Sequence, residues 1–502
     1  MRLAPFVLSG LLVFAPLTGV AEEGTAVSAA ATAAGTVATV AAPAAVVPKA
    51  VVIGADYRLG AENFGYFVVD LADGSVVAAL NADEPFMPAS VCKVPTTAAA
   101  LDILGPDHRF ETTVFVDGEV VDGVLDGVLI LRGGGDPVLT GDDLQGLAKD
   151  IAAAGIKKVD GEFHYDATAL VETPQINALQ PEVVGYNPGV SALSVNFNRV
   201  RMLWRNGDKG PSGEARAVSD NLTLVLDDIQ FAPADAPLPG PFAHAGGPSE
   251  EHWVLSPKIS SRGEDWLPVR DPARVAAEML RLLAAKAGVT LPEPTPGAVG
   301  PQAREIARHD SPDLAEIVRR VLRSSNNLAA ELIGLAASRA VTGRPLSLQD
   351  SAETVANYWR LRVADIDWDG FFLENQSGLS SKSRATPRQL VAILQAAADP
   401  AAGTGLYPLL RAASWKAPNG KTVRIRAKTG TIAYGRGLAG YIDAAGGQRL
   451  AFAVFFNDFE RRAALDAAFD PRVDAWDAGW RSWRARALRL EESLISGWAT
   501  GS

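Results

Sequence analysis

A serine and a lysine stand three residues apart in the stretch from Pro88 to Pro95. Ser90 and Lys93 come just before the apolar, Ala-rich segment 96–104, which we expect to be a helix with both residues on one face near its start. Backbone N–H groups without partners and the positive end of the helix dipole favour a reactive hydroxyl there. An unprotonated lysine amine can take the hydroxyl proton, which makes a serine nucleophile without a histidine. A Ser-x-x-Lys match is expected about once by chance in this chain, so it needs support from other residues.

Two further polar clusters follow in the chain. Ser325 and Asn327 lie where two predicted helices meet, although ordinary helix capping also explains short polar residues at such a corner. Ser324 and Asn326 fit the same Ser-x-Asn pattern. The third cluster ends a predicted strand and contains the only lysine that is followed by Thr-Gly, in the run Lys428-Thr429-Gly430-Thr431. The order of the three clusters, each in a suitable context, is a strong signal for one shared site.

The elements that must position these clusters are strands and helices in both halves of the chain. Residues 65–70 and 74–79 read as two strands of a hairpin, and 422–427, 437–443 and 450–456 read as an antiparallel meander. Cap residues followed by proline predict helices that open at Asp271-Pro272, Ser311-Pro312 and Thr386-Pro387. A stripe of large apolar residues from Trp476 to Trp498 predicts an amphipathic C-terminal helix. We expect this helix to pack on the protein's own sheet, with contact to a membrane surface as the alternative.

The middle of the chain has a different character. Between about 111 and 300, short β-like runs alternate with Gly and Asp, a helix is predicted at 142–153, and residues 232–250 look like a loop. We therefore expect an inserted β-rich domain or pair of domains at 111–300. A catalytic domain would then be formed by residues 50–110 and 301–502.

The N-terminus indicates export. Residues 1–21 have one basic residue, an apolar run and a small-residue cleavage site, which is typical of a secretory signal peptide, and 22–49 read as a low-complexity linker. The expected location is the periplasm.

Charge and composition exclude several classes of function. The formal net charge of −11 argues against nucleic acid as a partner. With five scattered histidines and Cys92 as the single cysteine, we expect no metal site, no cofactor and no internal disulfide.

With these motifs in hand, the sequence resembles the serine penicillin-recognising enzymes, and most closely their D-alanyl-D-alanine carboxypeptidase/endopeptidase family, the class C low-molecular-mass penicillin-binding proteins. Besides the three clusters, the residues that carry the resemblance are Gly133-Gly-Gly-Asp-Pro-Val-Leu139, Ser325-Asn-Asn-Leu-Ala-Ala-Glu331 and Ser377-Gly-Leu-Ser380. The long insertion between Ser90 and Lys428 fits the same family, and Leu-Ala-Ala-Glu after Asn327 favours the Ser325/Asn327 register. The resemblance implies an α+β fold, a penicillin-recognising transpeptidase-like domain whose antiparallel sheet is flanked by helices.

The resemblance also implies roles for the residues. Ser90 would be acylated, Lys93 would be its base, with a pKa lowered by burial and by Lys428, and Ser325 would relay a proton. Asn327 would hold Lys93 and a substrate amide, and Lys428 would offer a cation for the substrate carboxylate beside the hydroxyls of Thr429 and Thr431. Gly430 would let the substrate backbone lie close to the strand, and the backbone N–H groups of Ser90 and Thr431 would form the oxyanion hole.

The substrates implied are peptidoglycan stem peptides and cross-links, with β-lactam antibiotics as covalent inhibitors. A serine β-lactamase or esterase on the same scaffold is one alternative, because the motifs do not fix the rate of deacylation. A non-catalytic cell-wall-binding or β-lactam-sensing module is an alternative of another class.

Overall fold

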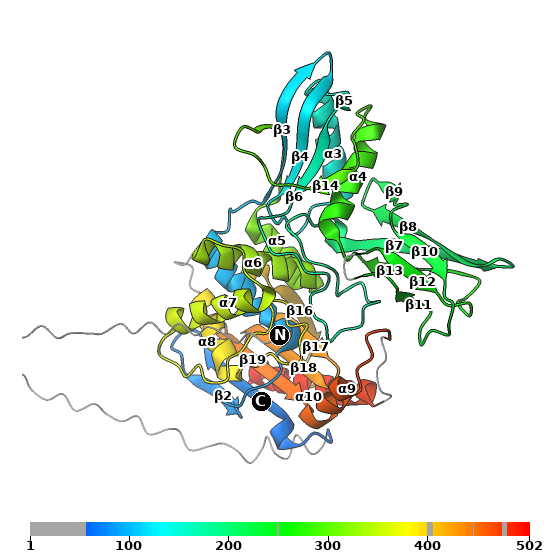
Figure 1. Ribbon diagram of the computed structural model, residues 1–502. Helices are drawn as coiled ribbons and strands as arrows, with labels where there is room; N and C mark the ends of the chain where they lie inside the picture. Colours follow the sequence, from blue (N-terminus) through cyan, green and yellow to red (C-terminus); the bar gives the residue numbers. More distant parts are fainter. Residues whose placement is uncertain (1–56, 248–249, 399–404, 445, 474–478, 502) are drawn as a thin grey trace, which may run out of the picture. The chain divides into compact units, whose positions relative to one another are not determined.

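A computed structural model describes residues 57–247, 250–398, 405–444, 446–473 and 479–501 of the 502-residue chain (Figure 1). The predicted signal peptide and linker lie outside the described residues. Strands from both ends of the described chain form one antiparallel, six-stranded sheet in the order β16-β17-β18-β19-β1-β2. Its strands are β1 (Phe64–Asp70), β2 (Val76–Leu80), β16 (Arg411–Lys416), β17 (Thr422–Ile432), β18 (Gly435–Asp443) and β19 (Arg449–Asn457).

The predicted hairpin and meander are both confirmed. β1 pairs with β2 on one side and with β19 on the other, which joins the N-terminal hairpin to the C-terminal meander. β16 pairs with β17 only as far as Arg411 opposite Ala427. The following residues of β17, Lys428 to Thr431, are paired with β18 alone.

Helices cover one face of this sheet. They are α2 (Lys93–Leu104), α5 (Leu314–Ser324), α6 (Asn327–Thr342), α7 (Leu348–Arg362) and α8 (Pro387–Ala398). Their buried apolar side chains form one cluster with the sheet residues Phe67, Ala453 and Phe455. This face positions the Ser90 and Ser325 segments, which precede α2 and α6.

The C-terminal helix α10 (Trp480–Thr500) covers the other face of the sheet, after the short helix α9 (Phe459–Ala467). Trp483, Ala487 and Leu490 are fully or almost fully buried against β-strand residues such as Phe452 and Val454. The prediction that this helix packs on the protein's own sheet is confirmed. In the part of the chain that the structure describes, no helix has the length and apolar character needed to cross a membrane.

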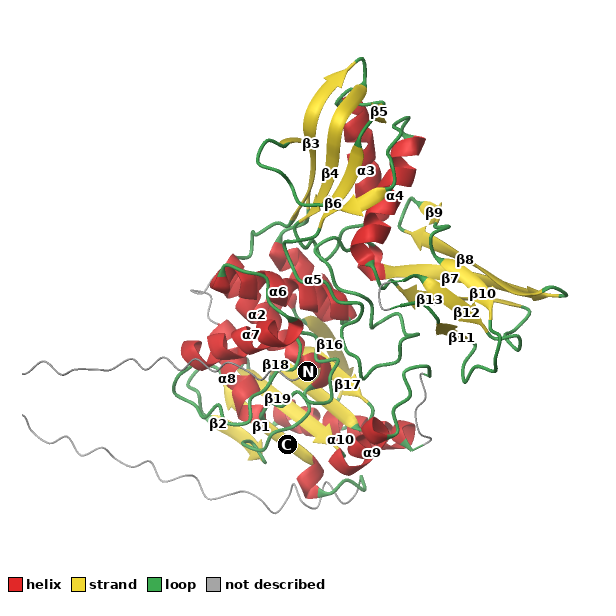
Figure 2. Ribbon diagram, viewed as in Figure 1, coloured by secondary structure: helices red, strands yellow, loops and turns green. Residues whose placement is uncertain are grey.

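The middle of the chain contains three more sheets (Figure 2). The first sheet runs β14-β6-β4-β3-β15, with β5 beside β4, and the other two run β13-β7-β8-β9 and β10-β12-β11. The bounds are β3 (Glu111–Val121), β4 (Val124–Gly133), α3 (Gly141–Ala153), β5 (Lys158–Val159), β6 (Glu162–Asp166), β7 (Arg199–Gly207), β8 (Gly210–Val218), β9 (Thr223–Val225), β10 (Gln230–Pro233), β11 (Phe242–His244), β12 (His252–Leu255), β13 (Arg262–Pro268), α4 (Pro272–Lys286), β14 (Pro294–Pro296) and β15 (Arg304–Asp310). Because β15 pairs with β3, the first of these sheets continues to Asp310.

Helix α6 belongs to two cores at once. Its Leu328, Leu332 and Leu335 pack into the apolar cluster of the middle region, whereas Ala329 and Ile333 pack into the cluster above the six-stranded sheet. The helix that begins at Asn327 is therefore held from both sides.

Two expectations about local structure are wrong. The helix predicted from Ser311-Pro312 begins later, at Leu314, and Asp313 is its N-cap. The Ser311 hydroxyl instead accepts a hydrogen bond from Phe110 N, which takes it away from capping. The predicted loop 232–250 contains β11, which is short and pairs with β12, so that pairing overrides the Pro- and Gly-rich composition.

Candidate active site

Ser90 lies in a tight turn rather than in the α-helix that the sequence predicts. Residues Ala89–Cys92 form a 3-10 helix, and α2 begins at Lys93. Residues three apart in a 3-10 turn lie one above the other, so Ser90 and Lys93 still face the same way. Ala89 has a backbone φ of 47°, a left-handed conformation that is uncommon for residues other than glycine. Strain of this kind at a candidate nucleophile is typical of functional turns.

Lys93 is completely buried and makes three polar contacts. Its Nζ atom lies 3.0 Å from Ser90 Oγ, 2.8 Å from Asn327 Oδ1 and 2.6 Å from the backbone oxygen of Ser377. Burial lowers the pKa of the Lys93 amine to about 7, and the nearby carboxylate of Glu331 opposes that change. A large share of this amine is therefore unprotonated near neutral pH.

The contacts at the corner between α5 and α6 show which of the two Ser-x-Asn patterns faces the polar cluster. Asn326 is the N-cap of α6, and its Oδ1 accepts from Ala329 N at 2.9 Å. Ser324 is exposed, and its hydroxyl donates to Arg320 O. Ser325, with a φ of 60°, ends α5, and Asn327 contacts Lys93. The capping interpretation thus holds for Asn326, while Ser325 and Asn327 face the polar cluster.

Lys428 contacts the second serine. Its Nζ atom donates to Ser325 Oγ at 2.8 Å and to the backbone oxygen of Thr429 at 2.6 Å. The side chain is 1% exposed. Burial lowers the pKa of Lys428 well below its ordinary value, and the positive charges of Lys93, Arg436 and Arg411 act in the same direction.

Gly430 allows β17 to lie against the Ser90 turn. A Cβ atom at this position would be 2.4 Å from Pro88 O and 3.1 Å from Ser90 N. Real Cβ atoms do not approach a backbone oxygen so closely, so only glycine fits. The third cluster is in this way brought next to the first.

Thr429 and Thr431 alternate with the buried Lys428 and Gly430 along β17, and both threonines are exposed. Arg436 on β18 donates from Nη1 to Thr431 Oγ1 at 3.2 Å. The same guanidinium forms a two-point ion pair with Glu491 of α10, at 2.8 and 2.6 Å. Both charged groups are almost fully buried. The C-terminal helix is thereby linked to the end of the third cluster.

Three groups at the site have no signal of their own in the sequence analysis. The backbone oxygens of Ser377 and Tyr186 accept from Lys93 and from Asn327 Nδ2, the latter at 3.1 Å. The carboxylate of Glu331 accepts from the backbone N–H groups of Gln376 and Ser377 and so holds the turn that contacts Lys93. Ser377 and Glu331 do lie within stretches that carry the family resemblance, which is the only signal that points to them.

The geometry therefore brings all three clusters into one polar site, with an amine of lowered pKa beside a serine hydroxyl. Such an arrangement can carry out nucleophilic acyl transfer without a metal ion. Among the described residues, no group of His, Cys, Asp and Glu side chains is arranged to hold a metal.

Comparison with known proteins gives consistent matches over most of the chain. The model of the D-Ala-D-Ala carboxypeptidase 3 (S13) family matches residues 50–476. The D-alanyl-D-alanine carboxypeptidase of an Actinomadura species is 28% identical over 446 residues, which cover 80% of this chain and 79% of that protein. The D-alanyl-D-alanine carboxypeptidase DacB of Haemophilus influenzae is 24% identical over 418 residues, 79% of this chain and 86% of that one.

Among solved structures, the crystal structure of penicillin binding protein 4 (dacB) from Haemophilus influenzae superimposes with a TM-score of 0.70. The two chains are 21% identical, and the match covers 87% of this chain and 96% of the other. This likeness shows that the two proteins share the fold, and it confirms the α+β, penicillin-recognising architecture.

Proposed function

Because the chain belongs to the D-Ala-D-Ala carboxypeptidase 3 (S13) family, as the resemblance indicated, we propose that Ser90 is the nucleophile and Lys93 the general base of its reaction. The protein is a serine-type D-Ala-D-Ala carboxypeptidase of the penicillin-binding class. The substrates proposed for it are peptidoglycan stem peptides that end in D-Ala-D-Ala. Cleavage of cross-links, an endopeptidase activity, is proposed on the same site.

The contacts of Lys93 suit a neutral amine, which has two N–H donors and one lone pair. Asn327 Oδ1 and the Ser377 carbonyl oxygen are pure acceptors and take the two N–H groups. The lone pair is then left for the Ser90 hydroxyl at 3.0 Å. As Ser90 Oγ bonds to the carbonyl carbon of the penultimate D-alanine, its proton passes to Lys93 Nζ.

Collapse of the tetrahedral intermediate breaks the C–N bond, and the departing nitrogen of the terminal D-alanine needs a proton. In the proposed mechanism the proton that Lys93 took from Ser90 passes through the Ser325 hydroxyl to this nitrogen, which returns Lys93 to its neutral form. Lys428 donates a hydrogen bond to that hydroxyl at 2.8 Å and so holds it in place. Water then attacks the Ser90 ester with Lys93 again as base. This step releases the shortened peptide and restores the free hydroxyl.

The exposed edge of β17 beyond Ala427 offers a place for the substrate backbone, because β16 does not extend along it. Lys428, Thr429 and Thr431 are proposed to hold the terminal carboxylate. The backbone N–H groups of Ser90 and Thr431 are proposed as the oxyanion hole.

The single observation that carries the proposal is the fully buried Lys93 amine, with its pKa lowered to about 7, beside the Ser90 hydroxyl. The direct test is covalent labelling by a fluorescent penicillin. We expect the wild-type protein to be labelled and Ser90→Ala to show no label. Labelling of Ser90→Ala at the wild-type rate would remove Ser90 from this role.

Lifetime of the acyl-enzyme separates the proposed peptidase from a β-lactamase. A peptidase holds the penicilloyl adduct for minutes or longer, whereas a β-lactamase sheds it quickly. Mass spectrometry of the intact protein after a penicillin pulse reads this lifetime directly. Release of D-alanine from a pentapeptide dismisses the non-catalytic alternative.

Location and domain division remain part of the proposal. We propose secretion to the periplasm through residues 1–21, a linker at 22–49 and an inserted region at 111–300 between two catalytic segments, 50–110 and 301–502. A membrane contact through α10 is not proposed, because the described part of its apolar stripe already packs against the sheet; Trp476 lies outside the described residues.

A further inference from the structure

A buried arginine outside the three clusters holds a loop that reaches the active site. Arg270 lies between β13 and α4 and is 3% exposed. Its Nη1 donates to Pro174 O at 3.0 Å and to Asn187 O at 3.2 Å, and its Nη2 donates to Glu182 O. All three acceptors are backbone oxygens of one segment, residues 174–187, which we call the wall loop.

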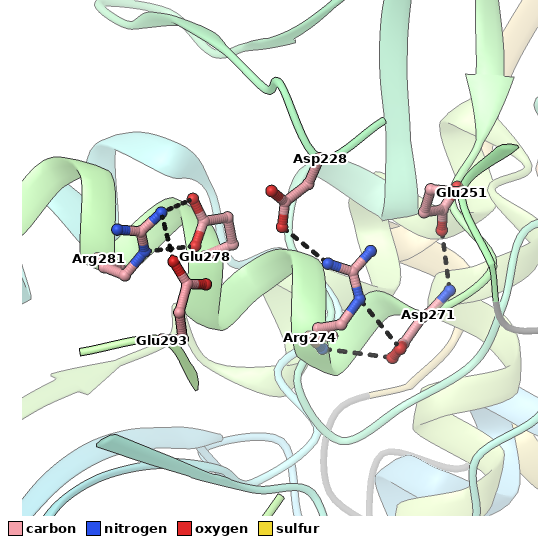
Figure 3. Close-up of polar contacts among 7 residues, drawn as sticks. All are labelled: Asp228, Glu251, Asp271, Arg274, Glu278, Arg281 and Glu293. Carbon is pink, nitrogen blue, oxygen red and sulfur yellow. Dashed lines mark hydrogen bonds and ion pairs between the residues drawn. The ribbon is translucent and has the colours of Figure 1, made fainter. Parts of the chain in front are cut away.

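Glu251 fixes the position from which Arg270 acts. Its Oε1 accepts from Arg270 N at 2.5 Å. It also accepts from Asp271 N at 2.9 Å (Figure 3), so one carboxylate holds the backbone just before α4. Glu251 is 4% exposed. The contacts of the Glu251 carboxylate are to backbone N–H groups, but the positive charge of Arg270 also acts on it and opposes the rise that burial causes in the pKa of Glu251. Removing either buried charge alone therefore leaves the other without that compensation.

The wall loop is also braced internally. Asn187 is fully buried, its Nδ2 donates to Asn177 O at 3.0 Å, and Asn177 N donates back to Asn187 Oδ1 at 2.9 Å. This reciprocal pair ties the two ends of the loop together. The loop is therefore held by its own hydrogen bonds as well as by Arg270.

The wall loop meets the active site at two points. The carbonyl oxygen of Tyr186 accepts from Asn327 Nδ2 at 3.1 Å. The side chains of Asn177 and Gln180 both donate to Leu379 O at 3.2 Å. Leu379 is two residues beyond Ser377, whose carbonyl oxygen accepts from Lys93. Both partners that take the N–H groups of Lys93 are thus supported by this loop.

We propose that Arg270 is a positioning residue for the reaction: by holding the wall loop it keeps the Tyr186 carbonyl against Asn327 and so fixes which end of the Asn327 amide faces Lys93. This inference rests on the proposed roles of Lys93 and Asn327. With Tyr186 O in place, the amide NH₂ is directed to that oxygen and Oδ1 to Lys93. Without it, the amide can turn and present its NH₂ group to the lone pair of Lys93, which the Ser90 proton needs.

The consequence is a change in base strength as well as in rate. A donor directed at the lone pair stabilises the neutral amine and lowers its affinity for a proton. Loss of the anchor therefore lowers the acylation rate and moves the low-pH midpoint of the rate profile downwards. A merely structural role for Arg270 would lower the amount of folded protein without moving that midpoint.

The test compares Arg270→Met and Arg270→Lys with Arg281→Met as a matched control. Arg281 lies on helix α4, which begins just after Arg270, and it pairs with Glu278 of that helix and with Glu293, which follows the helix (Figure 3). For each folded variant, the rate of penicillin acylation and kcat/KM for D-alanine release from a D-Ala-D-Ala peptide are measured from pH 5 to 9.

We expect both rates of Arg270→Met to fall roughly tenfold to a hundredfold, as for a small displacement in an active site, and the low-pH midpoint of the rate profile to fall as well. Arg270→Lys should recover part of the loss, and Arg281→Met should match the wild type.

Since a lone Glu251 charge can prevent folding, the double variant Arg270→Met/Glu251→Gln removes both charges together. If this variant or Arg270→Met is folded and keeps the wild-type rates and midpoint, the positioning role is overturned. That result would leave the proposed function intact, because the latter depends on the labelling of Ser90. Labelling that survives Ser90→Ala would instead overturn the proposed function.

Discussion

Lys428 Nζ lies 2.8 Å from Ser325 Oγ, so strand β17 contacts the corner between helices α5 and α6. Ser325 reaches this position because α5 ends there in a left-handed turn, with Ser325 N donating to Val321 O at 2.7 Å. The preceding hydroxyl, that of Ser324, donates to a carbonyl of its own helix instead. The two neighbouring serines therefore differ sharply in what they contact.

Ser325→Ala is expected to lower kcat/KM for D-alanine release by about two powers of ten, the lower end of the range for a group that transfers protons. Ser324→Ala is the matched control and should leave kcat/KM close to the wild type. Steady-state kinetics on one pentapeptide substrate makes the comparison. Equal losses in the two variants would contradict the assignment of the second cluster to Ser325.

We expect substitutions of the two neighbouring asparagines to have different effects, one mainly on stability and the other mainly on activity. Asn326→Ala removes the N-cap of α6 and should lower the free energy of unfolding by about 1 kcal/mol, with little change in acylation by penicillin. Asn327→Ala removes one of the two oxygen atoms that accept from the Lys93 amine and should impair acylation far more than stability. Chemical denaturation and acylation kinetics measure the two effects. A fully active Asn327→Ala protein would exclude Asn327 from the machinery.

Lys93 predicts how the reaction depends on pH. Its base form is required, and burial lowers its pKa to about 7, so kcat/KM should rise with pH and level off above about 7. Between pH 7 and its ordinary value of 10.5, the unfolded chain binds a proton at this amine that the folded chain does not. The stability that is linked to Lys93 therefore increases as pH rises from 7 to 10.5, and it is absent below pH 7. Rate profiles and unfolding curves at several pH values check both signs.

A matched variant isolates the contribution of Lys93 itself. Lys93→Met removes the amine while it keeps an unbranched apolar chain in the buried site, and we expect acylation to fall by about two to four powers of ten. The rising limb of the pH profile should disappear with it. A residual rate that keeps the same midpoint near pH 7 would mean that another group is the base.

The sequence predicts the main elements because their signals are local. Alternation of apolar residues at Val423 and Ile425 marks β17, and cap-plus-proline pairs mark the starts of α4 and α8. The same rule also predicts a helix start at Ser311, and this start is wrong although the helix forms, because the backbone N–H of Phe110, far away in the chain, donates to that hydroxyl. Local rules fail where a distant partner competes for the same group.

The three clusters were predictable by type and order, but their surroundings were not. The acceptors from Ser377 and Tyr186 are backbone carbonyl groups, which every residue has, so no side chain distinguishes them. The sequence also gives no sign of the left-handed conformation of Ala89, since alanine does not favour it. Arg270 and Glu251 look like ordinary surface charges until the fold buries them together.

Gly430 should be intolerant of even one added carbon. Gly430→Ala would place Cβ 2.4 Å from Pro88 O, so β17 and the Ser90 turn must separate. We expect a loss of about 1–3 kcal/mol in stability, typical of overpacking, and a fall in penicillin acylation of roughly a hundredfold.

Gly146→Ala in α3 is the control, because nothing lies within 4 Å of its Cβ. It should leave acylation unchanged and raise stability by about 0.5–1 kcal/mol. Normal acylation by Gly430→Ala would show that the close approach is dispensable.

Lys428 should matter most for substrates that carry a free terminal carboxylate. Its ammonium group is buried and already disfavoured by Lys93 and Arg436, so an arriving carboxylate gives it the counter-charge that the free site lacks. We expect Lys428→Ala to lower kcat/KM for a D-Ala-D-Ala peptide by about two powers of ten or more, because a buried charge partner is lost. The same variant should change kcat/KM far less for the peptide whose terminal carboxylate is converted to an amide, since that substrate has no charge to lose. Measuring kcat/KM for the two peptides with wild-type and variant enzyme isolates the contribution of the terminal carboxylate. Equal losses of kcat/KM for both peptides would mean that Lys428 holds Ser325 rather than the substrate.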